Sequence, residues 1–173
     1  AGDVLRAGET ACAWLQAEED DFIRFNHGRV RQAGSVIRAT LELRLVDAGR
    51  QASLTCTLTG RIDEDARLLA QARGDLRAIL ADSDPDPHGA IDEHPRAQTT
   101  GAPFMRPDPS LVCDTVCAAA GGADLVGFYA GGPMACGFAS SAGHALWHEA
   151  GSWFFDYCVY VDGDKAVKST LAD

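Results

Sequence analysis

The sequence predicts an α+β fold, and three observations support this prediction. Apolar and polar residues alternate over residues 37–45 and again over 52–58, as in strands with one buried face. The period then changes to that of an amphipathic helix over residues 63–81. Residues 125–171 contain short strand-like runs separated by glycine-rich stretches. We therefore expect two antiparallel-sheet-plus-helix units joined by a linker rich in Pro and Asp.

The first third of the chain is expected to form hairpins. An Asn-His-Gly run at residues 26–28 separates strand-like runs at 22–25 and 29–32, and Asn and Gly tolerate the positive φ of a tight turn. Residues 47–50, Asp-Ala-Gly-Arg, predict a second turn. Residues 11–17 supply one further candidate strand.

Two helices are expected. Residues 63–65 are all acidic and lie in the first turn of the helix at 63–81, where the helix dipole favours negative charge. The second helix begins after Asp108, a good N-cap, with Pro109 at its first position. The glycines at 121–122 end it.

The last third is expected to contain five short strands, with the glycine-containing runs between them acting as turns. The strands are expected at residues 125–129, 134–139, 145–149, 153–161 and 166–171, and the turns at 131–133, 140–143, 151 and 162–164.

The domain boundaries are set by residues that interrupt helices and strands. Residues 82–107 are rich in Pro, Asp and Gly, which indicates a linker or a long loop. Residues 1–81 are then an N-terminal sheet-and-helix unit. Residues 108–173 are a second helix-and-meander unit, which we expect to be incomplete.

Composition excludes some classes of function. Against 15 basic residues the 173-residue chain has 25 acidic ones, a net charge of −10, so a nucleic-acid binder is not expected. No apolar run is long enough to cross a membrane, and the first residues lack the apolar core of a signal peptide. The six scattered cysteines are expected to be small buried hydrophobes in a reducing cytoplasm.

The His148-Glu149 pair suggests a zinc site, but the spacing argues against one. A His-Glu-x-x-His motif needs His at position 152, where Ser152 stands. His144 and His148 are four residues apart, which in a strand is roughly 13 Å, too far for one ion. We expect instead a polar strand face, lining a groove, and no metal ligand in this chain.

A small basic patch is the other candidate site. Arg24, Arg29 and Arg31 lie close together in sequence, beside Phe22 and Phe25. Such a patch on an acidic chain can bind a carboxylate or the acidic face of a partner. The alternative is a set of intramolecular salt bridges on an exposed sheet.

Several blocks of sequence resemble a known family. One is Asp-Phe-Ile-Arg-Phe-Asn-His-Gly-Arg-Val-Arg-Gln-Ala-Gly at residues 21–34. The others lie at residues 127–133, 137–143, 147–149 and 155–169. In order and spacing they resemble the N-terminal half of the TldD/PmbA family of peptidase-related proteins, whose members were named for microcin maturation and for modulation of DNA gyrase.

The resemblance implies a protein of two parts. In TldD-type subunits the C-terminal part carries a His-Glu-x-x-x-His motif and a Cys that bind a catalytic zinc-type metal. PmbA-type (TldE) subunits lack this motif and pair with TldD around a chamber that admits unfolded peptides. The motif would need His at position 153, where this chain has Trp153, so no catalytic residue and no metal ligand can be carried over.

The resemblance therefore implies a scaffold and peptide-guiding region of a TldD/PmbA-type system that degrades or matures unfolded peptides. The alternative is a non-catalytic, PmbA/TldE-like module that assembles with a catalytic partner. The expected partners are unfolded peptide and a second subunit, in a homodimer or a TldD/TldE-type heterodimer, with no nucleic acid and no membrane. A free-standing enzyme is the least favoured reading, and whether the chain is a fragment or a natural truncation stays open. The candidates for peptide or partner contact are Arg24, Asn26, Arg29, Arg31, His144, His148 and Glu149.

Overall fold

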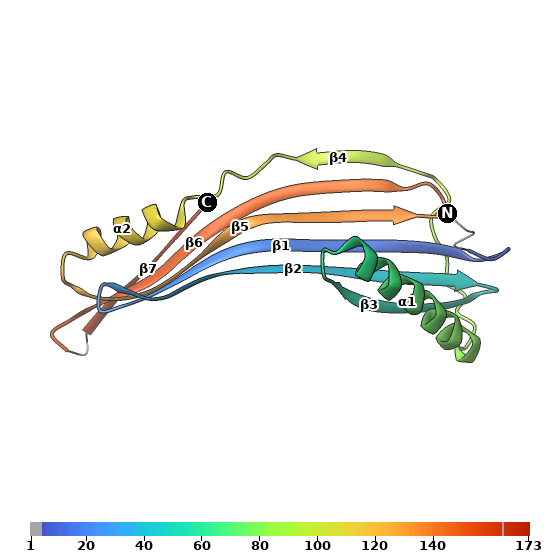
Figure 1. Cartoon of the computed structure of the whole chain (residues 1–173), viewed down its shortest axis with the longest axis horizontal. Helices are drawn as coiled ribbons and strands as arrows, with labels where there is room; N and C mark the ends of the chain where they lie inside the picture. Colours follow the sequence, from blue (N-terminus) through green and yellow to red (C-terminus); the bar gives the residue numbers. More distant parts are fainter. Residues whose placement is uncertain (1–4, 164) are drawn as a thin grey trace. The chain divides into compact units, whose positions relative to one another are not determined.

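The computed structural model describes residues 5–163 and 165–173. In these residues seven strands form one sheet, accompanied by two helices, so the predicted α+β class is confirmed (Figure 1). The elements are β1 (Thr10–Asn26), β2 (Arg29–Asp47), β3 (Arg50–Leu58), α1 (Ile62–Asp82), β4 (Ala97–Gly101), α2 (Pro109–Ala120), β5 (Asp124–Ser140), β6 (Ala145–Val161) and β7 (Lys165–Ala172).

The strands follow the order β3-β2-β1-β5-β6-β4, and β7 also pairs with β6. The pairs β2–β3 and β6–β7 are antiparallel, with Leu43 opposite Leu54 in the first and Phe155 opposite Leu171 in the second. Asp47 lies opposite Arg50 across the tight turn predicted at 47–50. The outer edge of β6 is therefore shared by two short strands, β4 and β7.

The tight turn predicted at residues 26–28 is also confirmed. His27 and Gly28 have φ values of 50° and 66°, and they connect β1 directly to β2. A Cβ on Gly28 would lie 3.0 Å from the carbonyl oxygen of Ala123, so glycine serves both the turn and the close approach of the chain before β5.

The strands of the last third are longer than predicted. The runs at 125–129 and 134–139 are parts of β5, and those at 145–149 and 153–161 are parts of β6. The glycines between them were wrongly interpreted as turns. The turns predicted at 140–143 and 162–164 are confirmed as far as the described residues extend, but residue 164 lies outside them.

Packing explains the glycines inside these strands. A Cβ on Gly131 would collide with Trp153, and one on Gly151 would collide with the ring of Phe104. Glycine inside a strand marks the place where a neighbouring group comes close, as well as a place where chains turn. A single sequence does not distinguish these two uses.

Strand β4 lies inside the segment expected to be a linker or a loop. All five of its residues are exposed, so no apolar alternation marks it in the sequence. Next to β4, the Arg96 carbonyl accepts a hydrogen bond from the Ala145 N–H at 2.9 Å. Pairing with β6 therefore creates this strand, and tertiary pairing often decides strand formation in this way.

Both helices confirm their predicted positions. In α1 the face made by Ala72, Leu76 and Leu80 is buried. At the start of α2 the Asp108 carboxylate accepts a hydrogen bond from the Ser110 N–H at 2.8 Å, and Gly121 ends the helix with φ of 55°. Neither helix in the described part of the chain is long and apolar enough to cross a membrane.

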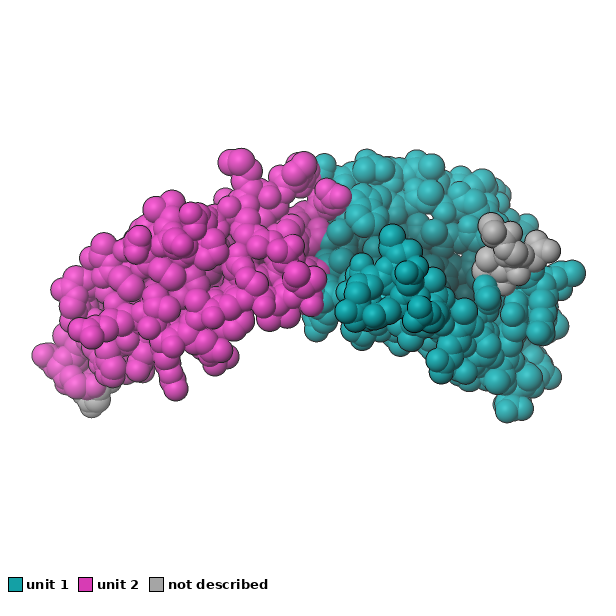
Figure 2. Space-filling view, in the orientation of Figure 1, with its two compact units in different colours: residues 1–17, 38–101, 135–148 teal, residues 18–37, 102–134, 149–173 magenta. Residues whose placement is uncertain are grey.

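The chain forms two compact units, each assembled from three separate stretches (Figure 2). The division of the sequence at residues 82–107 stays a prediction about domains. Unit 1 comprises the described residues up to 17 together with 38–101 and 135–148, and unit 2 comprises 18–37, 102–134 and 149–173.

Each unit has its own core. In unit 1 the helix α1 packs on β2 and β3, and the buried residues are Leu45, Ala52, Leu76 and Leu80. In unit 2 one side of α2 covers a larger cluster, made by Ile23, Phe25, Ala120, Leu125, Tyr129 and Phe155. All six cysteines are free thiols. Cys56 is buried as expected, but the other five are only partly buried, so the expectation that all six are buried was wrong for them.

Candidate functional site

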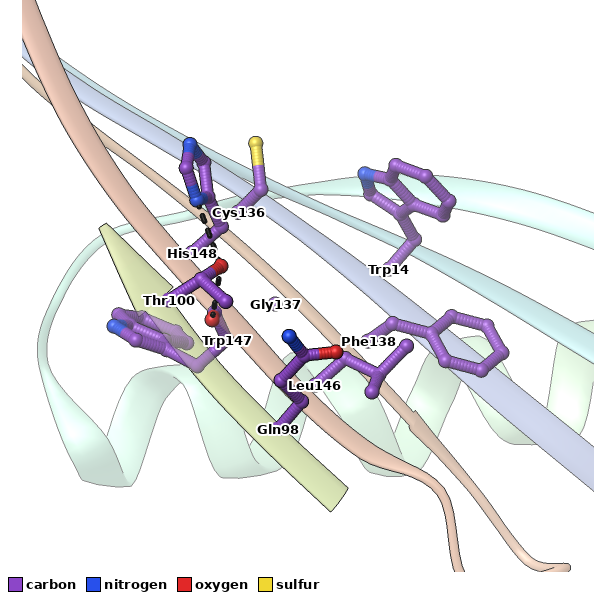
Figure 3. Close-up of a pocket in the computed structure, with 9 residues that line it drawn as sticks. All are labelled: Trp14, Gln98, Thr100, Cys136, Gly137, Phe138, Leu146, Trp147 and His148. Carbon is purple, nitrogen blue, oxygen red and sulfur yellow. Dashed lines mark hydrogen bonds between the residues drawn. The ribbon is translucent and has the colours of Figure 1, made fainter. Parts of the chain in front are cut away.

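One hollow of unit 1 lies beside the short edge strand β4 (Figure 3). We call it the tryptophan groove. It has a volume of about 510 Å³ and takes residues from β1, β4, β5 and β6. Its lining consists of Trp14, Gln98, Thr100, Cys136, Gly137, Phe138, Leu146, Trp147 and His148.

Aromatic side chains form one wall of the tryptophan groove. The rings of Trp14 and Phe138 meet edge to face with centroids 6.1 Å apart, and Phe138 meets the His144 ring in the same way at 5.8 Å. Trp14 is 50% exposed. An apolar wall that is already ordered and still open to solvent is typical of a binding surface.

Polar side chains form the opposite wall. Thr100 Oγ1 lies 2.9 Å from His148 Nδ1, so a hydrogen bond joins β4 to β6 across this wall (Figure 3). The Thr100 hydroxyl also lies 3.5 Å from the carbonyl oxygen of Trp147. These contacts fix the position of β4 beside the groove.

The outer edge of β4 is available for pairing. β4 ends the hydrogen-bonded path of strands, so its outer edge has no strand neighbour within residues 5–163 and 165–173. Because the Arg96 carbonyl faces β6, alternation turns the backbone groups of Ala97, Thr99 and Gly101 outward.

His144 is buried and holds the turn between β5 and β6. Its Nδ1 lies 2.7 Å from Ser140 Oγ, and its Nε2 lies 3.8 Å from Asp92 Oδ2. Ser140 Oγ also accepts hydrogen bonds from the N–H groups of Ala142 and His144, at 3.2 and 3.4 Å. Through these backbone hydrogen bonds Ser140 caps the turn between β5 and β6.

Asp92 completes this arrangement from the segment before β4. Hydrogen bonds from the backbone N–H and the ring of His94 lower the pKa of the Asp92 carboxyl group, and the nearby His144 adds to the effect. This contact with His144 connects the irregular segment before β4 to the turn between β5 and β6.

A second groove lies in unit 2, which we call the arginine groove. It has a volume of about 490 Å³. Ile23 and Phe25 of β1 face α2, so alternation turns Arg24 and Asn26 to the opposite face of the sheet. Its polar and aromatic lining includes Arg24, Asn26, Arg31, Phe128, Asp156 and Lys168.

The structure separates the predicted candidates. Arg24, Asn26 and Arg31 lie together in the arginine groove, while Arg29 is exposed and does not line it. His148 lines the tryptophan groove, and His144 lies buried beside Phe138. Glu149 belongs to unit 2 and lines neither groove. A role in contact with peptide or partner stays a prediction for all of these residues.

Several groove residues were not predicted. Trp14 and Phe138 lie in strand-like runs, and an exposed aromatic residue on a strand was the available signal. Thr100 lies in β4, which the sequence does not reveal, and Lys168 comes from β7, far away in the sequence.

No group of three or more His, Cys, Asp or Glu side chains suited to a metal ion occurs among the described residues. The donor sets in the two grooves are also sparse, with Cys136 and His148 in one and Asp156 and Cys158 in the other. They do not fit the ligand set that the resemblance implies for a catalytic subunit.

Solved structures share this fold. A candidate modulator of DNA gyrase from Bacteroides thetaiotaomicron matches with a TM-score of 0.65 at 13% identity, over 94% of this chain and 39% of that one. TldE from Thermococcus kodakarensis matches with 0.64 at 12%, over 95% and 39%. A candidate modulator of a DNA gyrase from Thermotoga maritima matches with 0.61 at 9%, also over 95% and 39%. No family model and no curated protein matches the sequence.

These matches define the class of fold. The chain has the fold of a part of TldE and of the gyrase-modulator proteins, and it spans 39% of the length of each. The structural neighbours are proteins of the TldD/PmbA family, as the sequence blocks indicated, and the share of their length that is covered is consistent with an N-terminal region.

Proposed function

We propose that this chain is the scaffold and peptide-guiding region of a TldD/PmbA-type peptidase system. Its own part is to bind and align an unfolded peptide, and hydrolysis takes place at a metal centre outside this chain. The observation that supports the proposal best is the outward edge of β4 beside the tryptophan groove.

An extended peptide can add to such an edge as a further strand. Its main-chain groups would pair with the outward groups of Ala97, Thr99 and Gly101, which gives affinity without sequence preference. Its alternate side chains would lie beside Gln98 and Thr100, the two residues of β4 that line the tryptophan groove. This combination suits substrates that share only an unfolded backbone.

The test is a proline substitution with a matched control. Thr99→Pro removes the outward N–H from an edge position where proline is tolerated, whereas Thr99→Ala keeps it. The probe is the fluorescein-labelled neutral peptide Gly-Ser-Phe-Gln-Phe-Gln-Ser-Gly amide, followed by fluorescence anisotropy. We expect Thr99→Pro to weaken binding about fivefold or more, since a lost hydrogen bond costs about 1 kcal/mol, and Thr99→Ala to leave it unchanged.

Equal binding by both variants would contradict pairing at β4. Hydrogen exchange gives an independent reading, because the amides of Thr99 and Gly101 gain protection only if a strand is added. A peptide that binds without this protection uses another surface.

A second candidate is a non-catalytic assembly module. It is favoured by the match to TldE, because the resemblance implies that TldE-type subunits lack the metal motif. In this alternative the open grooves and edges contact a partner subunit, and the chain contributes no chemistry of its own.

A further inference from the structure

The arginine groove concentrates positive charge on an acidic chain. Three cationic side chains, Arg24, Arg31 and Lys168, line it together with one carboxylate, that of Asp156. The net charge of the chain is −10, so this local excess has the opposite sign to the rest of the molecule. Clustered guanidinium groups have the geometry that recognises carboxylates.

Two of the three cations are held in place. The Arg24 guanidinium carbon lies 5.8 Å from the centroid of the Phe128 ring, and Lys168 Nζ lies 3.0 Å from Asp156 Oδ2. Asp156 also accepts a hydrogen bond from the Thr170 hydroxyl at 2.7 Å. The single carboxylate of the groove is therefore already engaged with its neighbours.

Arg31 is the cation left for a ligand. It is exposed, and within residues 5–163 and 165–173 no ion pair or hydrogen bond engages its guanidinium group. Arg24 lies in the same groove, with only a 3.4 Å hydrogen bond to Gln32 beside its ring contact. Together they present two guanidinium groups to one small volume.

Aromatic rings continue from the groove. Phe128 lies between Phe22 and Phe154, with centroids 6.5 and 5.8 Å away, and Phe154 is 40% exposed. A ligand that places a carboxylate on the arginines thus finds an apolar surface next to it.

We propose that the arginine groove binds a carboxylate-bearing residue of an extended peptide that has an aromatic neighbour. The carboxylate is that of an Asp or Glu side chain or of the peptide's C-terminus. The proposal rests on the peptide-guiding function and makes it selective, because acidic segments are held at this second point while the backbone is held elsewhere.

The test compares peptides that differ only in charge. The neutral probe Gly-Ser-Phe-Gln-Phe-Gln-Ser-Gly amide is compared with its Phe-Glu-Phe-Glu counterpart and with the neutral sequence carrying a free C-terminal carboxylate. In low salt the Glu peptide is expected to bind the whole chain about fivefold more tightly than the neutral one, which is the order of magnitude of charged pairs at a surface. The free carboxylate form shows whether a chain end is enough.

Substitutions assign the preference to the groove. Arg31→Gln and Arg24→Gln are each expected to remove most of the preference for Glu while leaving the affinity for the neutral peptide unchanged. Arg67→Gln, at an exposed position on α1, is the matched control for net charge, and it is expected to keep the preference. Since no ion pair or hydrogen bond engages the Arg31 guanidinium group in the described part of the chain, its variant tests the proposal even if Arg24→Gln folds poorly.

The outcomes separate the two proposals. Equal affinity for neutral and acidic peptides overturns this inference and leaves peptide guiding intact. A preference for Glu that survives both substitutions overturns the arginine groove as its source. Absence of binding for every peptide overturns the peptide-guiding function and this inference with it.

Discussion

At the scale of single residues, the best-defined interaction is the ion pair of Glu9 and Arg77. Glu9 Oε1 accepts from Arg77 Nε and Oε2 from Nη2, both at 2.6 Å, and the Glu9 side chain is only 4% exposed. The backbone N–H of Arg6 donates to the same carboxylate at 2.7 Å. This bidentate ion pair holds the segment before β1 against α1.

The pair predicts a specific loss of stability in acid. The hydrogen bonds from Arg77 lower the pKa of Glu9 from its usual 4.5 to about 2. A lowered pKa means that the ionised carboxylate stabilises the folded chain above pH 4.5, and this contribution fades as the pH falls towards 2. With solvent screening near the surface taken into account, we expect this contribution to be about 1–2 kcal/mol.

Glu9→Gln is therefore expected to lower the free energy of unfolding at pH 7 and to flatten its pH dependence below pH 4.5. Urea unfolding at a series of pH values measures both. Glu64→Gln is the control, since Glu64 pairs with Arg61 in the exposed first turn of α1 and is expected to change stability by under about 0.5 kcal/mol. Equal losses in the two variants would contradict the role given to Glu9.

At the scale of elements, α1 contains an avoidable weakness. Gly74 lies in the middle of the helix and is exposed, and a Cβ placed on it would have no atom within 4 Å. Glycine in a helix interior costs about 1 kcal/mol relative to alanine. No close neighbour requires glycine at this position.

Gly74→Ala is expected to raise the stability of the chain by about 0.5–1 kcal/mol, measurable by thermal or denaturant unfolding. Gly131→Ala is the contrasting variant, because its new Cβ would collide with Trp153, and a loss of stability is expected. A gain in both variants would show that the strand tolerates the added group.

The same elements show how far the sequence alone leads. The helix at 63–81 and the strands at 37–45 and 52–58 could be predicted because their burial follows a regular period. The sequence could not predict that β5 and β6 are each one continuous strand. Gly131 and Gly151 are required there because Trp153 and Phe104, distant in sequence, come close to them. Strand β4 could not be predicted either, because it forms by pairing with β6 and has no alternation of apolar and polar residues.

The candidate sites follow the same rule. Arg24 and Arg31 could be singled out because both lie near one hairpin, and charge near a turn is visible in the sequence. Lys168 and Asp156 complete their groove only after β6 and β7 pair. The tryptophan groove needs four strands to be in place, so the sequence does not show that Trp14 and Thr100 belong to one site.

At the scale of the whole molecule, charge bears on the choice of partner. Two copies of a chain with a net charge of −10 repel each other, most strongly at low ionic strength. We therefore expect the assembly alternative to act through a different, TldD-type subunit and not through a homodimer.

Light scattering coupled to size exclusion tests this expectation. The chain alone is expected to run as a monomer in low salt, and to form a complex of higher mass when mixed with a TldD-type protein. A stable dimer of the chain alone in low salt would contradict the expectation. Absence of any complex with the second protein would contradict the assembly alternative itself.

β4 has a further consequence. Its residues, Ala-Gln-Thr-Thr-Gly, include no charged residue and no proline. Such residues usually protect an exposed edge strand from pairing with the edge strand of another copy. At high protein concentration, two copies can therefore associate through their β4 edges. A lysine at position 99 would oppose this association. An edge without these groups can also pair with an extended peptide, which the proposed function requires.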